Sequence, residues 1–323
     1  MTEHPIHWET PGTSRVPFAV YTDEALHKKE LERFFYKSHW SYVGLEAEIP
    51  KVGDFKRTVV GERSVIMTRS EDGQIHVVEN VCAHRGMQFC RERHGNKKEF
   101  VCPYHQWSYK LQGDLQGVPF RRGVRQDGKV NGGMPADFDP KDHGLTSLKV
   151  ATRGGVVFAS FDHGVESLED FMGPTILKYF DRLFNGRKLV VLGYNRQRIP
   201  GNWKLMQENI KDPYHPGLLH TWFSTFGLWR ADNKSELKMD AQFRHAAMIS
   251  TRGEGGKNEE VVGGVDSFKD TMTLNDKRLL DIVPEAWWNG PTAVMTTVFP
   301  SLIIQQQVNS VSTRHIQPNG HGS

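Results

Sequence analysis

The sequence predicts an α+β protein with an all-β first domain and a second domain that mixes helices and strands. Between residues 40 and 160, short apolar runs alternate with turn residues, which is typical of a small antiparallel β-domain. From Ser167 onward, apolar residues recur at helical spacing. Residues 292–299 and 302–315 then alternate between apolar and polar positions, like strands of a sheet.

The N-terminal part predicts one amphipathic helix over residues 23–37. Thr22 is the expected N-cap, and Asp23 and Glu24 suit the positive start of a helix. The apolar side of this helix consists of Leu26, Leu31, Phe34 and Phe35. We expect residues 1–39 to form a helical segment that packs on the second domain.

The first domain is expected over residues 40–160. Its strands are expected at 41–45, 54–60, 64–68, 75–81, 107–111, 145–152 and 155–161. Tight turns are expected at 71–73 and 112–114. The segment 121–140 is rich in Gly, Asp and Lys, so we expect it to be a surface insertion.

The second domain is expected over residues 161–323. Ser167, followed by Asp170, is the predicted N-cap of its first helix. The apolar residues of that helix are Leu168, Phe171, Ile176, Leu177, Phe180 and Phe184. Strands are expected at 188–199, a helical stretch from about residue 202, and a mobile loop at 253–257.

The composition excludes several classes of protein. A net charge of +3 over 323 residues, with no interleaving of aromatic and basic residues, argues against binding to nucleic acid. The apolar runs are too short to span a bilayer, and no signal segment is recognisable, so we expect no membrane association. Three cysteines do not make a disulfide scaffold, which favours a reducing cytoplasm; Cys90 is expected to be a buried free thiol.

Two loops of the first domain each carry one cysteine and one histidine. Cys82-x-His84 is followed, after 17 intervening residues, by Cys102-x-x-His105. In a [2Fe–2S] cluster of mixed ligation, one iron takes two cysteines and the other takes two histidines. Cys2His2 also suits a structural zinc ion, but zinc fingers usually group a cysteine pair and then a histidine pair. Trp107 either shields this site or is an ordinary core aromatic.

A second pair of histidines, His215 and His220, follows the expected helix from residue 202. On one unbroken helix their side chains would point roughly 140° apart. Pro216 should push His215 out of the α region and break the helix there, so that the two imidazoles converge. Two histidines with open positions suit a mononuclear ferrous site, which needs one carboxylate to complete its ligands. Zinc, or two unrelated histidines at a helix junction, are the alternatives.

Three polar residues precede or adjoin this pair. Asp212, three positions before His215, can accept the second N–H of its imidazole and fix the tautomer. The alternative is an ordinary aspartate at a helix end. Asn209 and Tyr214 either surround the metal site or simply pack.

The paired motifs resemble those of the large (α) subunits of Rieske non-haem iron aromatic-ring-hydroxylating oxygenases. The similarity covers essentially the whole chain. It runs through RVPF at 15–18, VCAHRGM at 81–87, GNWKL at 201–205 and QQQVNS at 305–310. Within the family, the chain is most similar to members that hydroxylate salicylate, and less so to anthranilate and terephthalate dioxygenases.

The resemblance implies a catalytic domain made of a helix-flanked antiparallel sheet. It also implies an α3β3 (or α3) ring with small β subunits, in which Asp212 bridges His215 and His105 of a neighbouring subunit. The third iron ligand of the family is an aspartate in a late helix. The chain ends at Ser323 before any segment that matches it, and we therefore expect about a hundred residues to be missing. Four downstream aspartates come too early: Asp266, Asp270, Asp276 and Asp281.

The function implied by the resemblance is a terminal oxygenase that uses O2. Electrons would come from NADH indirectly, through a reductase and a ferredoxin, and salicylate would become gentisate. The alternatives are a dioxygenase for anthranilate or a related acid, and a Rieske-type electron carrier with no oxygenase activity. The resemblance suggests Asn209, Met248 and Gln307 as substrate-binding residues, while Arg314 either holds the substrate carboxylate or faces solvent.

Overall fold

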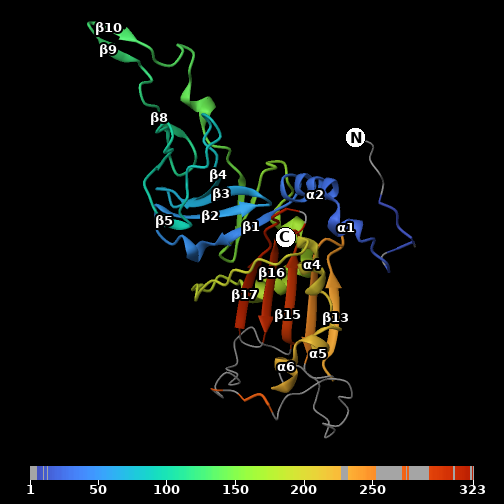
Figure 1. Cartoon of the computed structure of the whole chain (residues 1–323). Helices are drawn as coiled ribbons and strands as arrows, with labels where there is room; N and C mark the ends of the chain where they lie inside the picture. Colours follow the sequence, from blue (N-terminus) through green and yellow to red (C-terminus); the bar gives the residue numbers. More distant parts are fainter. Residues whose placement is uncertain are drawn as a thin grey trace.

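The computed structural model describes residues 6–9, 11–12, 14–226, 232–251, 271–273, 275, 291–307, 310–320 and 322. Its strands form two main groups, one around the cysteine–histidine loops and one around a five-stranded antiparallel sheet (Figure 1). The α+β fold class and the helix-flanked antiparallel sheet are confirmed. Within the described residues, no helix is long and apolar enough to cross a membrane.

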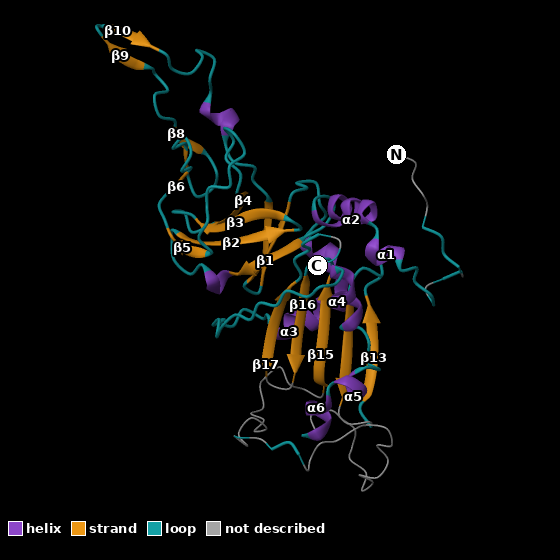
Figure 2. Cartoon of the chain, viewed as in Figure 1, coloured by secondary structure: helices purple, strands orange, loops and turns teal. Residues whose placement is uncertain are grey.

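The first group contains three small antiparallel sheets and a hairpin (Figure 2). Its strands are β1 (Ser41–Leu45), β2 (Asp54–Val60), β3 (Arg63–Arg69), β4 (Ile75–Glu79), β5 (His94–Asn96), β6 (Phe100–Val101), β7 (Ser108–Tyr109), β8 (Leu115–Gly117), β9 (Val124–Gln126), β10 (Lys129–Asn131), β11 (Lys149–Arg153) and β12 (Val156–Ser160). They pair in the orders β4-β3-β2-β5, β6-β7-β8 and β1-β12-β11, with β9 and β10 as the hairpin. Two 3-10 helices, η2 (Glu46–Glu48) and η3 (Pro140–His143), connect strands.

The predicted surface insertion at 121–140 contains this hairpin, which projects away from the rest of the chain (Figure 1). All six residues of β9 and β10 are exposed. The insertion is anchored at its far end, where Phe138 and Met134 pack on the apolar cluster beneath the cysteine–histidine loops.

The second group is the sheet β13-β14-β15-β16-β17. Its strands are β13 (Lys234–Met239), β14 (Ala246–Thr251), β15 (Pro291–Val298), β16 (Leu302–Gln307) and β17 (Ser310–His315). Helix α3 (Leu168–Leu183) packs on one face of the sheet. Helix α4 (Trp203–Asn209) lies at the end near the first group of strands, and α5 (Pro216–Leu219) and α6 (Thr221–Thr225) lie at the far end (Figure 2). The predicted N-cap of α3 is confirmed, because the Ser167 hydroxyl accepts from the backbone N–H of Asp170 at 3.1 Å.

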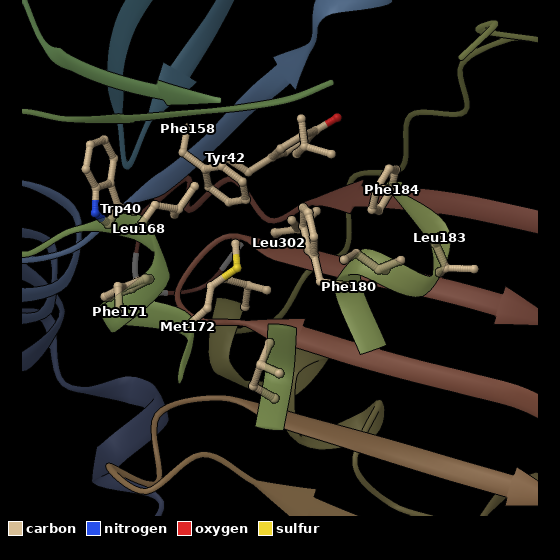
Figure 3. Close-up of a cluster of buried hydrophobic side chains, with 14 of the residues drawn as sticks. Trp40, Tyr42, Phe158, Leu168, Phe171, Met172, Phe180, Leu183, Phe184 and Leu302 are labelled. Atoms are coloured by element: carbon tan, nitrogen blue, oxygen red, sulfur yellow. The ribbon is translucent and has the colours of Figure 1, made fainter. Parts of the chain in front are cut away.

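One apolar core joins the two groups. Figure 3 shows Tyr42 and Phe158, from β1 and β12, packed beside Phe180 of α3 and Leu302 of the sheet, and all four are buried. Because strands of the first domain help to form the core of the second, the domain limits at residues 39/40 and 160/161 stay predictions.

The N-terminal helix differs in detail from the expectation. Helix α2 (Glu24–Glu30) continues as a π-helix, η1 (Leu31–Phe35), and a short helix α1 (Ala19–Thr22) precedes it. Thr22 as N-cap is wrong: its hydroxyl bonds back to the carbonyl of Phe18 at 3.2 Å, because Thr22 ends α1. The cap is Asp23, whose carboxylate accepts from the N–H of Leu26 at 2.7 Å.

The predicted strands at 188–199 are also wrong, since these residues contain no helix or strand. The apolar run at 189–192 pairs with no strand among the described residues, and Leu192 is 97% exposed. A hydrogen bond from the Tyr194 hydroxyl to Glu48, at 2.7 Å, ties the segment to the first group of strands. The predicted loop at 253–257 lies outside the described residues.

Candidate functional site: two metal-binding regions

The two cysteine–histidine loops have the same backbone design. Each cysteine carbonyl accepts from the N–H four residues on, at 2.9 Å, in Gly86 and in Gln106. Each cysteine N–H donates to the carbonyl five residues on, also at 2.9 Å. Gly86 and Gln106 both have positive φ, 70° and 57°, which closes the loops; this conformation is uncommon for a residue other than glycine. Two equivalent loops thus present one cysteine and one histidine each.

The four side chains converge with the thiols inside and the imidazoles outside. Cys82 and Cys102 are 3% and 1% exposed, while His84 and His105 are partly exposed. The two imidazole rings lie 4.5 Å apart at 74°. Burial raises the pKa of the Cys102 thiol and the nearby Cys82 adds to this, whereas backbone N–H groups of Tyr104 and His105 lower it.

The state of the His84 imidazole fits a [2Fe–2S] cluster at these four residues. Nδ1 of His84 is buried and has no hydrogen-bond partner among the described residues, as a metal-ligating nitrogen would. Burial, His105 and Arg85 lower the pKa of His84, which keeps the ring in the neutral form that binds metal. Trp107 is buried and stacks on His84, with ring centroids 4.7 Å apart and 12° between planes. Its shielding position therefore has direct support in the packing.

Sequence reasoning missed Tyr109. Its hydroxyl lies 3.2 Å from Sγ of Cys82 and accepts from the N–H of Ala83 at 3.1 Å. A cluster-binding thiolate can only accept, so the hydroxyl would then donate its proton to the sulfur. Hydrogen bonds to ligand sulfurs tune the reduction potential of iron–sulfur clusters. The only signal in the sequence is an aromatic residue in the strand after the second motif. Cys90, by contrast, is a buried free thiol as predicted.

The second region lies at the far end of the five-stranded sheet, on α5 and α6 (Figure 1). Nε2 of His215 and Nε2 of His220 face each other at 3.1 Å. Two imidazoles bound at right angles, about 2.1 Å from one metal ion, would hold their nitrogens about 3 Å apart. Burial, His215 and Arg314 lower the pKa of His220, which favours the neutral ring. The pair therefore fits one metal ion.

The helix break between these histidines and α4 is present, but its predicted cause is wrong. His215 has φ −67° and ψ −29°, inside the α region, although Pro216 follows it. The chain leaves helical geometry earlier, since α4 ends at Asn209, and Pro216 takes the first position of α5, where proline is tolerated. The preference of a residue before proline is thus overridden by the local turn.

Asp212 adopts the geometry expected of it. Its Oδ2 lies 3.2 Å from Nδ1 of His215, and its Oδ1 accepts from the N–H of Tyr214 at 2.7 Å. This arrangement places the ring proton of His215 on Nδ1 and leaves Nε2 for the metal. Nδ2 of Asn209 lies 3.3 Å from Nε2 of His215, so Asn209 also adjoins the metal position. Tyr214 is 79% exposed and does not pack in the interior.

The remaining predicted residues share one face of the sheet. The strand register puts Met248, Met295 and Gln305 in one row across β14–β16. By strand register, Gln307 and Arg314 lie on the same side of the sheet as that row, which is the face opposite to α3. Nε2 of Gln305 donates to Gln307 at 3.2 Å, and Arg314 donates to Gln305. Gln305, which hydrogen-bonds to both Gln307 and Arg314, was not predicted as a site residue from the sequence.

Within the described part of the chain, there is no group of three histidine, cysteine, aspartate or glutamate side chains that could together hold one metal ion. Two ligands per iron are what the cluster loops should provide. At the predicted mononuclear site the two histidines lie together, and no third, carboxylate side chain within the described ranges joins them. Asp266, Asp270, Asp276 and Asp281 all lie outside those ranges.

Comparison with known proteins defines the class. Residues 39–127 match the model of the Rieske [2Fe-2S] domain, and residues 186–323 match that of the ring hydroxylating alpha subunit catalytic domain. The chain belongs to the Rieske non-haem iron ring-hydroxylating oxygenases, as an α subunit. It is 81% identical to the salicylate 5-hydroxylase large oxygenase component of Ralstonia sp, over 98% of this chain and 75% of that protein.

Two other relatives fit the same class. The chain is 41% identical to the anthranilate 1,2-dioxygenase large subunit of Burkholderia cepacia, over 98% of this chain and 74% of that protein. Naphthalene 1,2-dioxygenase from Rhodococcus sp., solved with bound indole, superimposes with a TM-score of 0.74 at 27% identity, covering 95% of this chain and 70% of that one. The family and fold expected from the motifs are confirmed.

Proposed function

We propose that this chain is the α subunit of a terminal oxygenase that hydroxylates salicylate to gentisate (2,5-dihydroxybenzoate). The observation that carries the proposal is the 81% identity to a salicylate 5-hydroxylase large oxygenase component over nearly the whole chain. Dioxygenation of anthranilate or a related acid is the second candidate, favoured by the 41% identity to an anthranilate dioxygenase subunit. A simple electron carrier would not need the catalytic domain matched at residues 186–323.

Each residue would have a distinct role. Cys82, His84, Cys102 and His105 would hold the [2Fe–2S] cluster, and His215 and His220 would hold the mononuclear iron. When bound, the cluster relays single electrons and the ferrous ion activates O2. Asp212 holds the proton of His215 on Nδ1 and so keeps Nε2 directed at the metal position.

The separation of the two regions supports a ring of subunits. The cysteine–histidine loops lie near β6–β8, whereas α5 and α6 lie at the opposite end of the five-stranded sheet (Figure 1). Electrons from the cluster of one subunit would therefore enter the iron site of a neighbour, with Asp212 between His215 and His105 of the partner subunit. Such head-to-tail contacts close into a ring, here α3 or α3β3.

A multicomponent system is the expected setting. NADH delivers a hydride, so a reductase and a ferredoxin would convert it to the single electrons that the cluster accepts. The partly exposed His84 and His105 give a ferredoxin access to the cluster edge. A cytoplasmic location, suggested by the cysteine usage, stays a prediction.

The face of the sheet opposite to α3 suits an aromatic acid. Met248 and Met295 offer apolar surface for a ring, and Gln307, Gln305 and Arg314 form a hydrogen-bonded polar row beside it. Burial lowers the pKa of Arg314, and it acts on His220 electrostatically, which brings its charge near the metal site. A carboxylate of the substrate would bind Arg314, and Asn209 would adjoin the ring.

Oxygen-18 labelling separates the two candidate functions. The purified oxygenase, supplied with NADH, reductase and ferredoxin, would be incubated with salicylate or anthranilate under labelled O2, and the products weighed by mass spectrometry. We expect gentisate carrying one labelled atom from salicylate, and slower turnover of anthranilate. Two labelled atoms in the main product, or a preference for anthranilate, would favour the dioxygenase.

A further inference from the structure

A buried carboxylate in the N-terminal helix has no part in the mechanism described so far. Glu30, the last residue of α2, is 5% exposed. Its Oε2 accepts from Nε1 of Trp203 at 3.1 Å, and both its oxygens lie 2.8 Å from Nζ of Lys204. The side chains of Lys204 and Glu30 are only 16% and 6% exposed. A buried ion pair is tolerated only when its hydrogen bonds are satisfied, and loss of one partner is strongly disruptive.

The same N-terminal segment contacts both ends of α4. Asn202, the N-cap of α4, donates through Nδ2 to the carbonyl of Tyr21 at 3.0 Å. The hydroxyl of Tyr21 reaches both oxygens of Glu208, near the other end, at 2.8 Å. Burial and this contact raise the pKa of Tyr21 to about 12, so the hydroxyl keeps the proton that it donates.

The turn between β15 and β16, together with Phe35 of η1, also contacts α4. The ring of Trp203 packs on Phe35 at 5.2 Å and on Phe299 at 5.7 Å. Nε2 of Gln207 donates to the carbonyl of Pro300 at 2.8 Å. Helix α4 is therefore fixed between the N-terminal helices and the sheet.

The end of α4 leads directly into the metal site. Asn209, its last residue, adjoins Nε2 of His215, and its carbonyl accepts from the N–H of Asp212 at 3.3 Å. Asp212 in turn lies 3.2 Å from Nδ1 of His215. With seven residues, α4 is about 10 Å long, so its two end residues, Trp203 and Asn209, belong to one short hydrogen-bonded segment.

We propose that Glu30 is a positioning residue for the mononuclear iron site, acting through Trp203 and Lys204 on α4. The N-terminal helices then do more than cover the catalytic domain: they set the orientation of Asn209 and Asp212 toward His215. The inference rests on the proposed function only in taking His215 as an iron ligand. It does not depend on which aromatic acid is the substrate.

The test compares Glu30→Gln and Glu30→Ala with a matched control. Glu30→Gln keeps the size of the side chain and an acceptor for Trp203 but removes the charge that binds Lys204. The control is Glu24→Gln, on the same helix, whose partner Lys28 lies 2.9 Å away and whose pair is 63% and 71% exposed. Each variant is made in the complete oxygenase.

Two readouts report on the iron site without turnover. The first is hydrogen–deuterium exchange of residues 203–215 in metal-free protein. The second is the spin-resonance spectrum of the nitric oxide adduct of the ferrous site. We expect about tenfold faster exchange in α4 and a broadened adduct signal for both Glu30 variants, graded from Gln to Ala, with cluster absorbance unchanged. Turnover should fall about tenfold, with KM changed less than twofold.

Three outcomes would overturn the proposal. One is wild-type exchange and adduct spectra in Glu30→Ala, and another is an equal response in Glu24→Gln. The third is loss of cluster and iron together, which would show a general structural role. If neither Glu30 variant folds, Tyr21→Phe decides the question, because it removes only the hydroxyl that binds Glu208. It should produce the same spectral change at smaller amplitude, and a wild-type spectrum would reject the proposal.

Discussion

The two metal-binding regions are built in opposite ways. At the cluster loops, each cysteine is held by hydrogen bonds to residues four and five positions on, and the same pattern occurs twice. At the predicted mononuclear site, His215 and His220 flank the short helix α5 as its N-cap and C-cap residues. The helix that leads to them, α4, is anchored at Trp203 by Glu30, more than 170 residues away. Geometry is local in the first region and depends on long-range contacts in the second.

Because of this difference, the two regions should respond differently to mutations. A local loop keeps its shape until one of its own residues changes. A site assembled by distant contacts responds to changes far from the metal, as the proposal for Glu30 illustrates. The predictions below test that contrast.

The largest effect should follow from His84→Ala. Each iron of the cluster has only two protein ligands, so loss of one should abolish cluster assembly and all turnover, while the iron site still binds metal. Visible absorbance and the spin-resonance signal of the reduced cluster measure the change. His94→Ala, at an exposed histidine of the same domain, is the control. Retention of the cluster in His84→Ala would contradict its assignment as a ligand.

Asp212→Ala should leave both metals bound and reduce turnover about 100-fold. The carboxylate fixes the proton on Nδ1 of His215 and, in the proposed ring, links the two subunits. Metal analysis and the rate of cluster oxidation in a single turnover separate the two parts of this expectation. Asp137→Ala, at an exposed aspartate of the insertion, is the comparison. Normal turnover of Asp212→Ala would refute the bridging role.

Mild acid should destabilise the catalytic sheet through His245. This ring is fully buried; Nε2 donates to Phe171 at 2.7 Å and Nδ1 accepts from the N–H of Phe299 at 3.0 Å. Burial lowers its pKa from 6.5 to about 4, so its contribution to stability is present above pH 6.5 and is lost as the pH falls toward 4. Between pH 7.5 and 5 the loss should be about 2 kcal/mol.

Thermal unfolding at the two pH values measures this loss, and His245→Phe supplies the comparison. The variant should be less stable at both pH values, because Phe171 and Phe299 lose a hydrogen-bond partner. Its dependence on pH should be smaller than that of the parent by about 2 kcal/mol. An unchanged dependence would show that other groups control the acid response.

The smallest effect is expected for Tyr109→Phe. A hydrogen bond donated to Sγ of Cys82 stabilises the reduced, more negative cluster, so its removal should lower the reduction potential. A hydrogen bond of about 1 kcal/mol corresponds to about 40 mV for one electron. Redox titration followed by the cluster signal measures the shift. An unchanged or raised potential would mean that the hydroxyl proton does not point to sulfur.

The sequence predicted the first region better than the second. Strands 41–45 and 54–60 were placed at their observed limits, and the four predicted cluster residues lie together, His84 beside His105 and Cys82 beside Cys102. Tyr109 was not predicted because its hydroxyl comes close to Cys82 only after the chain around the two loops has packed. The strands expected at 188–199 are absent, because a short apolar run alone does not supply a pairing partner.

For the second region, the sequence indicated which residues lie together but not their setting. His215, His220 and Asp212 adjoin one another as expected, although the backbone of His215 stays in the α region. Gln305 and Glu30 were missed, since each acts through partners remote in the chain. No local pattern marks a glutamate that will meet a lysine on another helix.

By itself, the sequence determined which thiols and imidazoles are available to bind metal. Residue type and short spacing decide which thiols and imidazoles can bind one cluster, and these properties are local. The tertiary structure alone decided where α4 sits, which face of the sheet receives Met248 and Arg314, and how far the two metal regions lie apart. Those features depend on burial and on hydrogen bonds between distant segments, and such contacts exist only after the chain has folded.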